Sequence, residues 1–480
     1  MAACFRRRLP ASQKDKNPLP TNNKQPQPVR GSQKDESSPL ARLGRRLVNF
    51  AGRFADVFHT RTDSGASHAK IYLQGLLSRQ PAKNMERMAE VIADVSWQNL
   101  QQFISDSTWD ERALWDRIAE CANARLGGHR ESMLVIDESA MAKQGKSSAG
   151  VARQYNGRLG KIDRCQVGVF SVLARGTEAT MVGARLFLPA EWTGDKERCL
   201  KAGVPEEEIR ELTKLDLARE LIDQAMEQRL NIAGVCFDSF YGRDQSLLAE
   251  VVALGLRVVA DIPVDTLLWR QKPEGSERPE QIAASGAQRA DLMPMPAARE
   301  VMLRDGENGP VRVQVTALRV WLWPQDNDTP SEWWLMRMVQ SDGTQKHTLI
   351  NAPADTRLEV LARWQGQRFF VEQTFKNAKS HVGAADYQVR KWRGWHHHMA
   401  LVGLALLFLL EEKQEHCVTL PLLSACDITE MLDYYFCQAA SANDVVRRIL
   451  NRHQRRRTVT ESKRRVARRR RIQAANLVTK

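Results

Sequence analysis

Two short apolar runs in this chain are each followed directly by an aspartate. The first run, residues 132–136, precedes Asp137, and the second, residues 232–237, precedes Asp238. Both runs are short, rich in β-forming residues and followed by residues typical of turns, so each predicts a buried strand that delivers an aspartate at its carboxyl end. A chain with two such strands is expected to fold as an α/β protein in which the two carboxylates can meet.

A third acid, Glu372, lies in a segment with a different periodicity. In residues 368–379, spacings of three, four and seven place Arg368, Glu372, Phe375 and Lys379 near one face of a helix. Two strands and one helix are therefore predicted to converge on a single acidic site.

The chemistry that such a site supports is cleavage of phosphodiesters. Two Mg²⁺ ions about 3.5 to 4 Å apart stabilise the attacking and the leaving oxygen together. Mg²⁺ prefers oxygen ligands and keeps several waters, so three carboxylates and a substrate phosphate suffice, and Mn²⁺ can substitute. Arg368 and Lys379 would hold phosphate oxygens, the first as a bidentate fork and the second as a point charge. An aspartate at a strand end is also common as a helix cap or turn residue, and it is the combination that favours catalysis.

Several sequence blocks resemble a known family. They are residues 83–90 (KNMERMAE), 97–103, 136–139 (IDES), 143–146, 150–155, 160–161, 165–167, 372–383 and 395–396. Together they resemble insertion-sequence transposases of the DDE type, in particular the group named after insertion sequence 701, which is related to the insertion sequence 4 group. The resemblance covers about residues 70 to 410. It implies a ribonuclease-H-like catalytic core with Asp137, Asp238 and Glu372 as metal ligands. Related families carry a Tyr-x-x-Arg-x-x-x-Glu-x-x-x-x-x-x-Lys signature, and here Gln365 stands at the tyrosine position.

The expected architecture is an α/β catalytic core with a β-rich insertion, preceded by a helical domain and followed by a helical basic tail. The expected boundaries are a disordered arm at 1–40, a helical domain at 41–130, a core at 131–265 and 360–412, an insertion at 266–359 and a tail at 413–480. By analogy with the family, the helical domain is the candidate for binding transposon ends. A capping box at residues 108–111 and helical spacing of Trp97, Leu100, Phe103 and Ile104 support its helices.

Within the core, strands are expected at 166–173, 180–188 and 256–261, and a helix at 213–229. The first and fourth strands of a ribonuclease-H-like sheet lie side by side, which would bring Asp137 near Asp238. Glu138 ranks second as a ligand because it should point to the opposite side of the strand, and Asp244 and Asp261 rank lower. The segment between the first two strands is expected to be a loop whose basic residues, Lys143, Lys146, Arg153 and Lys161, contact DNA phosphates.

Alternating apolar and polar residues at 311–321 and 333–339 predict antiparallel strands in the insertion. Some cut-and-paste transposases carry such an insertion, in which a tryptophan stacks on a flipped base during hairpin formation. Trp321, Trp323, Trp333 and Trp334 are candidates by position, because base stacking on an exposed aromatic is worth about 1 to 3 kcal/mol. Packing in the core is the alternative for each.

Positive charge is concentrated at the ends of the chain. Residues 447–471 contain thirteen Lys and Arg against Glu461, residues 1–40 carry +5, and Lys480 adds +1, so residues 41–446 carry −4 of the total of +14. The tail, including Arg455, Arg456, Arg457, Arg468, Arg469 and Arg470, is expected to bind DNA phosphates without sequence preference and with strong salt dependence. A solvated basic end with no dedicated partner is the alternative.

Other features narrow the class of protein. No apolar segment follows Arg6–Arg8, and the longest apolar stretch, 399–410, is shorter than the roughly twenty residues of a membrane span, so it is expected to be a buried helix. The eight cysteines show no zinc-ligand spacing and fit a reducing cytoplasm. Three consecutive histidines, 396–398, point in different directions on a helix and are expected to pack or cap rather than to bind one ion.

The sequence thus favours a transposase that binds the ends of its element, cleaves DNA with Mg²⁺ and joins the 3′-hydroxyl ends to target DNA. Its expected partners are double-stranded DNA and further copies of itself, as a dimer or higher oligomer on DNA, with no membrane. The expected location is the bacterial cytoplasm, at the nucleoid. A nuclease of the same fold without strand transfer and a catalytically silent DNA-binding descendant are the alternatives.

Overall fold

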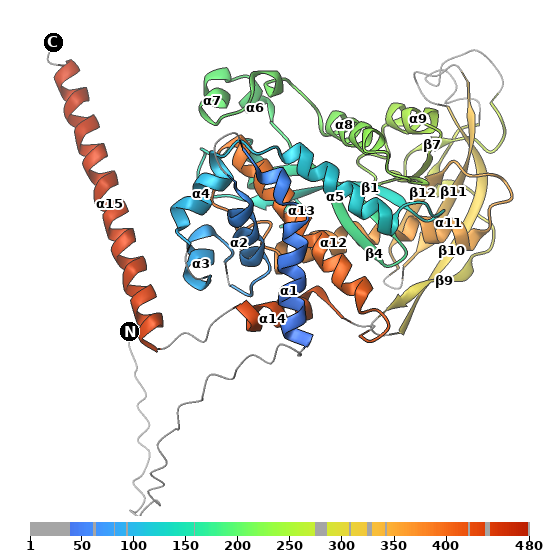
Figure 1. Cartoon of the computed structure of the whole chain (residues 1–480). Helices are drawn as coiled ribbons and strands as arrows, with labels where there is room; N and C mark the ends of the chain where they lie inside the picture. Colours follow the sequence, from blue (N-terminus) through green and yellow to red (C-terminus); the bar gives the residue numbers. More distant parts are fainter. Residues whose placement is uncertain are drawn as a thin grey trace, which may run out of the picture.

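The computed structural model describes residues 39–478 except 61–63, 81, 93–94, 158, 274–285, 307–308, 324–328, 341–342, 421–422 and 437–441. The arm predicted at 1–40 therefore lies outside the described residues, apart from Pro39 and Leu40, which begin the first helix. The fold is mixed α/β, with helices packed around a large mixed sheet (Figure 1).

A ten-stranded sheet forms the centre of the molecule, with the strand order β2-β3-β1-β5-β6-β12-β11-β10-β9 and β4 paired with β3. The strands are β1 Met133–Ala142, β2 Ala152–Asn156, β3 Lys161–Arg175, β4 Glu178–Leu186, β5 Gly234–Phe237, β6 Arg257–Asp261, β9 Arg299–Gly306, β10 Gly309–Leu322, β11 Ser331–Val339 and β12 Gln345–Ile350. Strands β1, β5 and β6 are parallel to one another, and the other pairings in this sheet are antiparallel.

The strands that carry the acids follow the expected apolar runs. All four residues of β5 and the first four of β1 are buried, as continuous apolar runs in the parallel part of a sheet require. The prediction that Asp137 ends its strand was wrong, because β1 continues to Ala142 in an antiparallel pairing with β3. The prediction that residues 143–161 form only a loop was also wrong, because the short strand β2 pairs with the first residues of β3.

Helices precede, cover and follow the sheet. They are α1 Pro39–Gly52, α2 Ala66–Leu76, α3 Met85–Val91, α4 Trp97–Ser105, α5 Glu111–Leu126, α6 Ala190–Thr193, α7 Lys196–Lys201, α8 Lys214–Glu227, α9 Gln245–Ala253, α11 Leu358–Gly366, α12 Phe369–His381, α13 Trp392–Glu415, α14 Ala425–Phe436 and α15 Ala442–Val478, with short 3-10 turns at Ala55–Phe58, Glu206–Glu208 and Ala290–Leu292. The N-cap of α5 is Asp110, whose side chain accepts from the backbone of Arg112, so the expected capping box at 108–111 is replaced by a cap two residues further on.

Helix α13 supplies the largest part of the interior. Its residues 394–410 are all buried, which confirms the buried helix expected at 399–410. The three histidines of this helix are buried as well: His398 contacts the hydroxyl of Tyr72, and His397 contacts the backbone of α4 and Trp109. Among the described helices, none is long and apolar enough to cross a membrane.

The β-rich segment between β6 and α11 extends the central sheet. Strand β12 pairs with β6, with Thr348 opposite Asp261, and β11, β10 and β9 follow in order. A two-stranded sheet of β7 Leu267–Leu268 and β8 Gln288–Arg289 lies beside it. The segment is thus bonded directly to β6, the strand that ends in Asp261.

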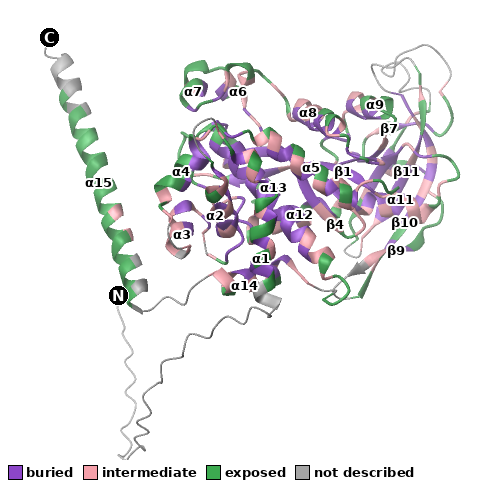
Figure 2. Cartoon of the chain, viewed as in Figure 1, coloured by how far each residue is buried: buried purple, intermediate pink, exposed green. Residues whose placement is uncertain are grey.

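The basic end of the chain forms the long helix α15. It stands away from the body of the molecule, and almost all of its described side chains are exposed (Figures 1 and 2). An ion pair between Arg452 of α15 and Glu90 of α3, at a distance of 3.5 Å, connects this helix to the helical part of the chain.

Candidate active site

Three aspartates lie in a row across three neighbouring parallel strands. Val135 of β1 pairs with Cys236 of β5, so Asp137 and Asp238 each follow two residues beyond the same pair. Phe237 pairs with Ala260, so Asp238 and Asp261 each follow one residue beyond that pair. Neighbouring strands are about 4.8 Å apart, so the sheet itself brings these acids together.

Burial and mutual repulsion raise the pKa of Asp137. Its pKa rises to about 7, mainly through burial and further through the negative charge of Asp238, while Arg368 opposes the shift. One oxygen of Asp137 accepts from the backbone N–H of Glu138 at 2.7 Å. A buried carboxylate beside a second carboxylate is stabilised in its charged form by a cation, and hard divalent cations fit this oxygen donor set.

The turn after β5 fixes Asp238. Its side chain accepts from the backbone N–H groups of Phe240 at 2.9 Å and Tyr241 at 3.2 Å, and its carbonyl accepts from Gly242 at 2.7 Å. A Cβ at Gly242 would lie 2.0 Å from the carbonyl oxygen of Asp261, so only glycine fits between the two strand ends. The chain is therefore held close to β6 at the point where it delivers Asp238.

Glu138 already has partners on the other side of β1. Its carboxylate accepts from Lys214 of α8 at 2.7 Å and from the hydroxyl of Tyr241 at 3.5 Å. Burial and the charge of Glu138 raise the pKa of Tyr241 well above its usual value, so this hydroxyl stays protonated and can donate. This pairing supports the lower rank of Glu138 as a ligand.

Arg368 lies at the centre of the acidic group. Its Nε is 3.0 Å from Asp261 Oδ2, and its Nη2 is 3.7 Å from Glu372 Oε1. Burial lowers the pKa of Arg368, but the charges of Asp261, Asp137, Asp238 and Glu372 together outweigh this and hold it above the usual value. The guanidinium, which is only 13% exposed, therefore interacts with acids of the sheet and of helix α12.

Asp261 holds Arg368 in place through their ion pair. It is 7% exposed, and its Oδ1 accepts from Thr348 at 2.7 Å and from Gln365 at 3.3 Å. Gln365, at the position where related families carry tyrosine, thus contacts the acid that holds Arg368. From the sequence alone Asp261 ranked low as a ligand, because only the strand register shows that it shares a row with Asp137 and Asp238.

Glu372 differs from the two strand-borne acids. It lies on a helix, α12, as predicted from the spacing, in the first turn of that helix, and its side chain is 61% exposed. Within the described ranges, no group of three His, Cys, Asp or Glu residues is arranged to hold a metal ion. The structure therefore brings Asp137 and Asp238 together and leaves Glu372 at the rim, one ion-pair distance from Arg368.

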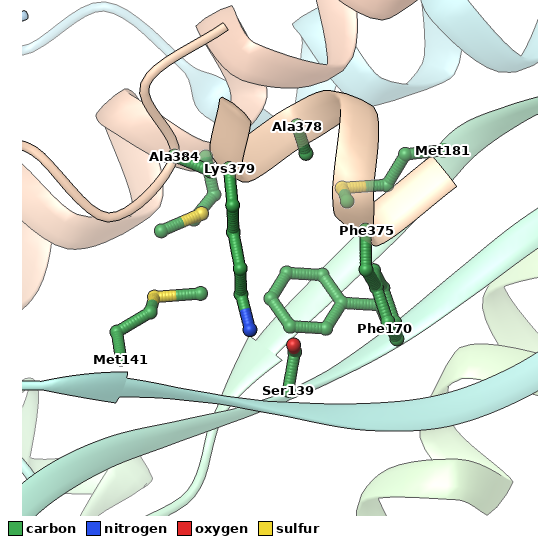
Figure 3. Close-up of a pocket in the computed structure, with 9 residues that line it drawn as sticks. Ser139, Met141, Phe170, Met181, Phe375, Ala378, Lys379 and Ala384 are labelled. Atoms are coloured by element: carbon green, nitrogen blue, oxygen red, sulfur yellow. The ribbon is translucent and has the colours of Figure 1, made fainter. Parts of the chain in front are cut away.

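Two of the predicted phosphate-binding lysines have protein partners. Lys379 reaches from α12 into a small apolar cavity, toward Ser139 and Met141 of β1, and donates to the carbonyl of Ala140 at 3.2 Å (Figure 3). Lys143 donates to the carbonyl of Tyr387 at 3.0 Å, and its Nζ lies 3.2 Å from the centre of that ring. Burial lowers the pKa of Lys143 to about 7.

The remaining predicted phosphate-binding residues lie on the surface. Lys146, Arg153 and Lys161 are exposed on or beside the β2–β3 hairpin. In α15, Arg456, Arg457, Arg468 and Arg469 are exposed and Arg455 is partly exposed, whereas the side chain of Arg470 lies outside what the structure describes. The exposed residues of this set, unlike Lys143 and Lys379, are accessible to DNA without any rearrangement.

The four candidate stacking residues are not equivalent. Trp323 and Trp333 are 6% and 3% exposed, and Trp323 packs against Trp269. Trp321 and Trp334 are partly exposed, and Trp334 donates to the carbonyl of Pro353 at 3.0 Å. Core packing thus accounts for Trp323 and Trp333, and only Trp321 and Trp334 offer part of a ring to a base.

Comparisons with known proteins identify the family of this chain. A family model described as DDE superfamily endonuclease matches residues 53–317, a segment that includes the strands bearing Asp137 and Asp238. The chain is also 32% identical over 189 residues to a probable transposase for insertion sequence element IS701 from Microchaete diplosiphon, an alignment that spans 39% of this chain and 46% of that relative. These matches confirm the resemblance to DDE transposases related to the insertion sequence 701 group. Because the family model matches more than half of the length of this chain, the chain belongs to the DDE superfamily of endonucleases.

Proposed function

We propose that this protein is a transposase that binds the ends of an insertion sequence, cleaves DNA with divalent cations and transfers the freed 3′-hydroxyl ends into target DNA. The observation that carries the proposal is the adjacency of Asp137 and Asp238 on parallel strands, inside the segment that matches the endonuclease family. The relative's name as a probable transposase supports the same activity for this chain.

The strand order supports a ribonuclease-H-like core. Strands β3 and β4 lie antiparallel on one side of β1, and β5 and β6 lie parallel on the other. The core would comprise 131–265 and 360–412, and the segment 266–359 would be an insertion that lengthens its sheet. The helices of 41–130 are the candidates for recognising transposon ends.

In the proposed site, Asp137 and Asp238 would hold the cations, and Glu372 would complete the second cation position. Two Mg²⁺ ions, or Mn²⁺ in their place, would stabilise the attacking and leaving oxygens and lower the pKa of the attacking water. Glu372 would have to turn inward from its exposed position, and it would then exchange its contact with Arg368 for one with a cation. Arg368 would then bind the substrate phosphate in place of Glu372.

Asp261 acts as a positioning residue in this scheme. Its contacts with Thr348 and Gln365 fix one carboxylate oxygen, and the other holds Arg368 at 3.0 Å. Because Arg368 has its own counter-charge, it does not need to neutralise Asp137 or Asp238. Those two carboxylates therefore stay available to cations.

DNA would be bound by surfaces beyond the site. The exposed arginines of α15 would contact phosphates and release counterions, which gives salt-dependent binding without sequence preference. Both ends of an element must be cut and joined together, so a dimer or higher oligomer on bacterial chromosomal DNA in the cytoplasm is expected. A base flipped during a hairpin step would stack on Trp321 or Trp334.

The test uses the full chain, Mg²⁺ and duplexes that carry the DNA flanking the coding region. The wild-type protein should cleave the strand at the element end and join it to a target duplex, and Asp238→Ala should do neither. Equal cleavage by the two proteins would refute the proposal. Cleavage without joining would identify a nuclease, and binding in EDTA without cleavage in Mg²⁺ would identify a catalytically silent DNA-binding protein.

A further inference from the structure

The β2–β3 hairpin extends beyond the end of β1. Strand β1 ends at Ala142, which pairs with Cys165, and Lys143 donates one further backbone hydrogen bond to the carbonyl of Arg164, whereas residues 161–163 of β3 pair with β2 only. The hairpin is therefore a two-stranded ribbon that continues the sheet beyond the end of β1. It extends in the direction in which β1 runs, which is the edge where Asp137 and Asp238 are delivered.

One face of this ribbon is on the same side of the sheet as Asp137. Asp137 pairs with Phe170, and side chains at every second residue of β3 share that side, down to Arg164 and Ile162. Phe170 itself is buried and packs against Phe375 of α12. The ribbon thus continues the face that is covered by the helix bearing Glu372.

Basic, aromatic and aliphatic side chains occupy the exposed part of this face. Arg153 pairs with Arg164, and Tyr155 pairs with Ile162. Tyr155 and Ile162 are each 61% exposed, and Arg153 is exposed as well. The acid of the ribbon, Asp163, pairs with Gln154 and so belongs to the opposite face.

We infer that this face, formed by Arg153, Tyr155, Ile162 and Arg164, is a duplex DNA-binding arm that holds substrate beside the cleavage site. The inference rests on the proposed function. A two-stranded β-ribbon fits a DNA groove. Two arginines without a neighbouring acid on this face suit phosphates, and Tyr155 and Ile162 suit the sugars and base edges between them.

The reach of the arm is consistent with a duplex that also enters the active site. Asp137 pairs with Phe170 of β3, and Ile162 lies eight residues before Phe170 on the same strand. The distance along the strand from Phe170 to Ile162 is about 26 Å. DNA rises about 3.4 Å per base pair, so the arm would contact a duplex about eight base pairs from the reacting phosphate.

The test measures binding by fluorescence anisotropy in EDTA, where no cleavage occurs, with a duplex of about 40 base pairs from the DNA flanking the coding region. Tyr155→Ala should weaken binding about tenfold, and Tyr155→Phe, which keeps the ring, should bind as the wild type does. Arg153→Ala with Arg164→Ala should lower the slope of log K against log salt by about 2. The matched controls are Tyr434→Ala, which removes a tyrosine that is 71% exposed on α14, and Arg312→Ala with Arg357→Ala.

If the ribbon variants bind DNA as their controls do, the inference is wrong. It is also wrong if the arginine pair changes the oligomeric state of the DNA-free protein, because the face would then contact a second copy. Binding in EDTA does not require catalysis. A wild-type protein that binds DNA through the ribbon but never cleaves it would therefore refute the proposed function and still support the DNA-binding arm. Melting curves of each variant identify those that fail to fold.

Discussion

The two strand-borne acids and the helix-borne acid of the proposed site are held in different ways. Asp137 and Asp238 are fixed by the sheet register and by backbone hydrogen bonds, in partly or largely buried positions. Glu372 is on the first turn of α12, is mostly exposed, and lies 3.7 Å from Arg368 at the edge of the group. The sheet thus provides a permanent pair, and the helix provides a third ligand that has to move.

The largest effect is expected when a strand-borne acid is neutralised. Asp137→Asn or Asp238→Asn should lower DNA cleavage at least about 10³-fold, equivalent to about 4 kcal/mol of transition-state stabilisation. Both variants should also lose binding of Mn²⁺ to the DNA-free protein, measured by titration calorimetry. Glu138→Gln is the control, because its carboxylate is already paired with Lys214. Retained Mn²⁺ binding in both aspartate variants would contradict the permanent pair.

Glu372→Gln should separate cleavage from metal binding. Cleavage should fall about 10²- to 10³-fold, because the second cation loses a ligand. Binding of Mn²⁺ to the DNA-free protein should change little, because Glu372 is not yet in place. Glu359→Gln is a matched control, since Glu359 is an acid in the first turn of the neighbouring helix α11 and also pairs with an arginine. If Glu372→Gln lost Mn²⁺ binding as completely as Asp137→Asn, the proposed inward movement would be unnecessary.

Asp261→Asn should have a smaller effect that acts through Arg368. Without its counter-charge, the guanidinium should turn to Asp137 and Asp238 and compete with cations, so Mn²⁺ affinity should fall about tenfold. Thr348→Val removes a hydrogen bond to Asp261 without changing the charge, and it should lower the affinity less. Unchanged Mn²⁺ affinity in Asp261→Asn, in a variant that melts as the wild type does, would show that Asp261 has only a structural role.

The same comparison shows what the sequence could predict. Apolar runs identified the strands before Asp137 and Asp238, and helical spacing placed Glu372 on a helix, because both patterns are local. The row of three aspartates depends on strand register, which pairs Val135 with Cys236, 101 positions later, and Phe237 with Ala260, 23 positions later. For that reason, no local sequence pattern identified Asp261 as a member of the site.

Solvent exposure was the other property that the sequence did not supply. Lys143 and Lys379 are basic residues of the type expected to bind phosphates, but they contact Tyr387 and the carbonyl of Ala140 instead, and burial lowers the pKa of Lys143 to about 7. Strand β2 was missed because its five residues include three polar ones and no apolar alternation long enough to predict a strand. Whether a basic residue faces DNA or the interior depends on neighbours that fold over it from other parts of the chain.

The last expected effect is on the stability of the metal-free protein, and not on metal binding or cleavage. The pKa of Asp137 is raised to about 7 in the folded state, mainly by burial and then by Asp238, with Arg368 opposing and Glu138 adding to the shift. Between about pH 4 and pH 7 the folded protein keeps a proton that the unfolded chain releases, so the free energy of unfolding should fall as pH rises through this window and stay level above it. The loss should be about 1 to 4 kcal/mol, and Asp137→Asn should lack this part of the pH dependence, as measured by urea unfolding in EDTA at pH 5 and pH 8. Identical pH profiles for the two proteins would mean that the strand-borne pair is less strongly buried and coupled than the sheet register indicates.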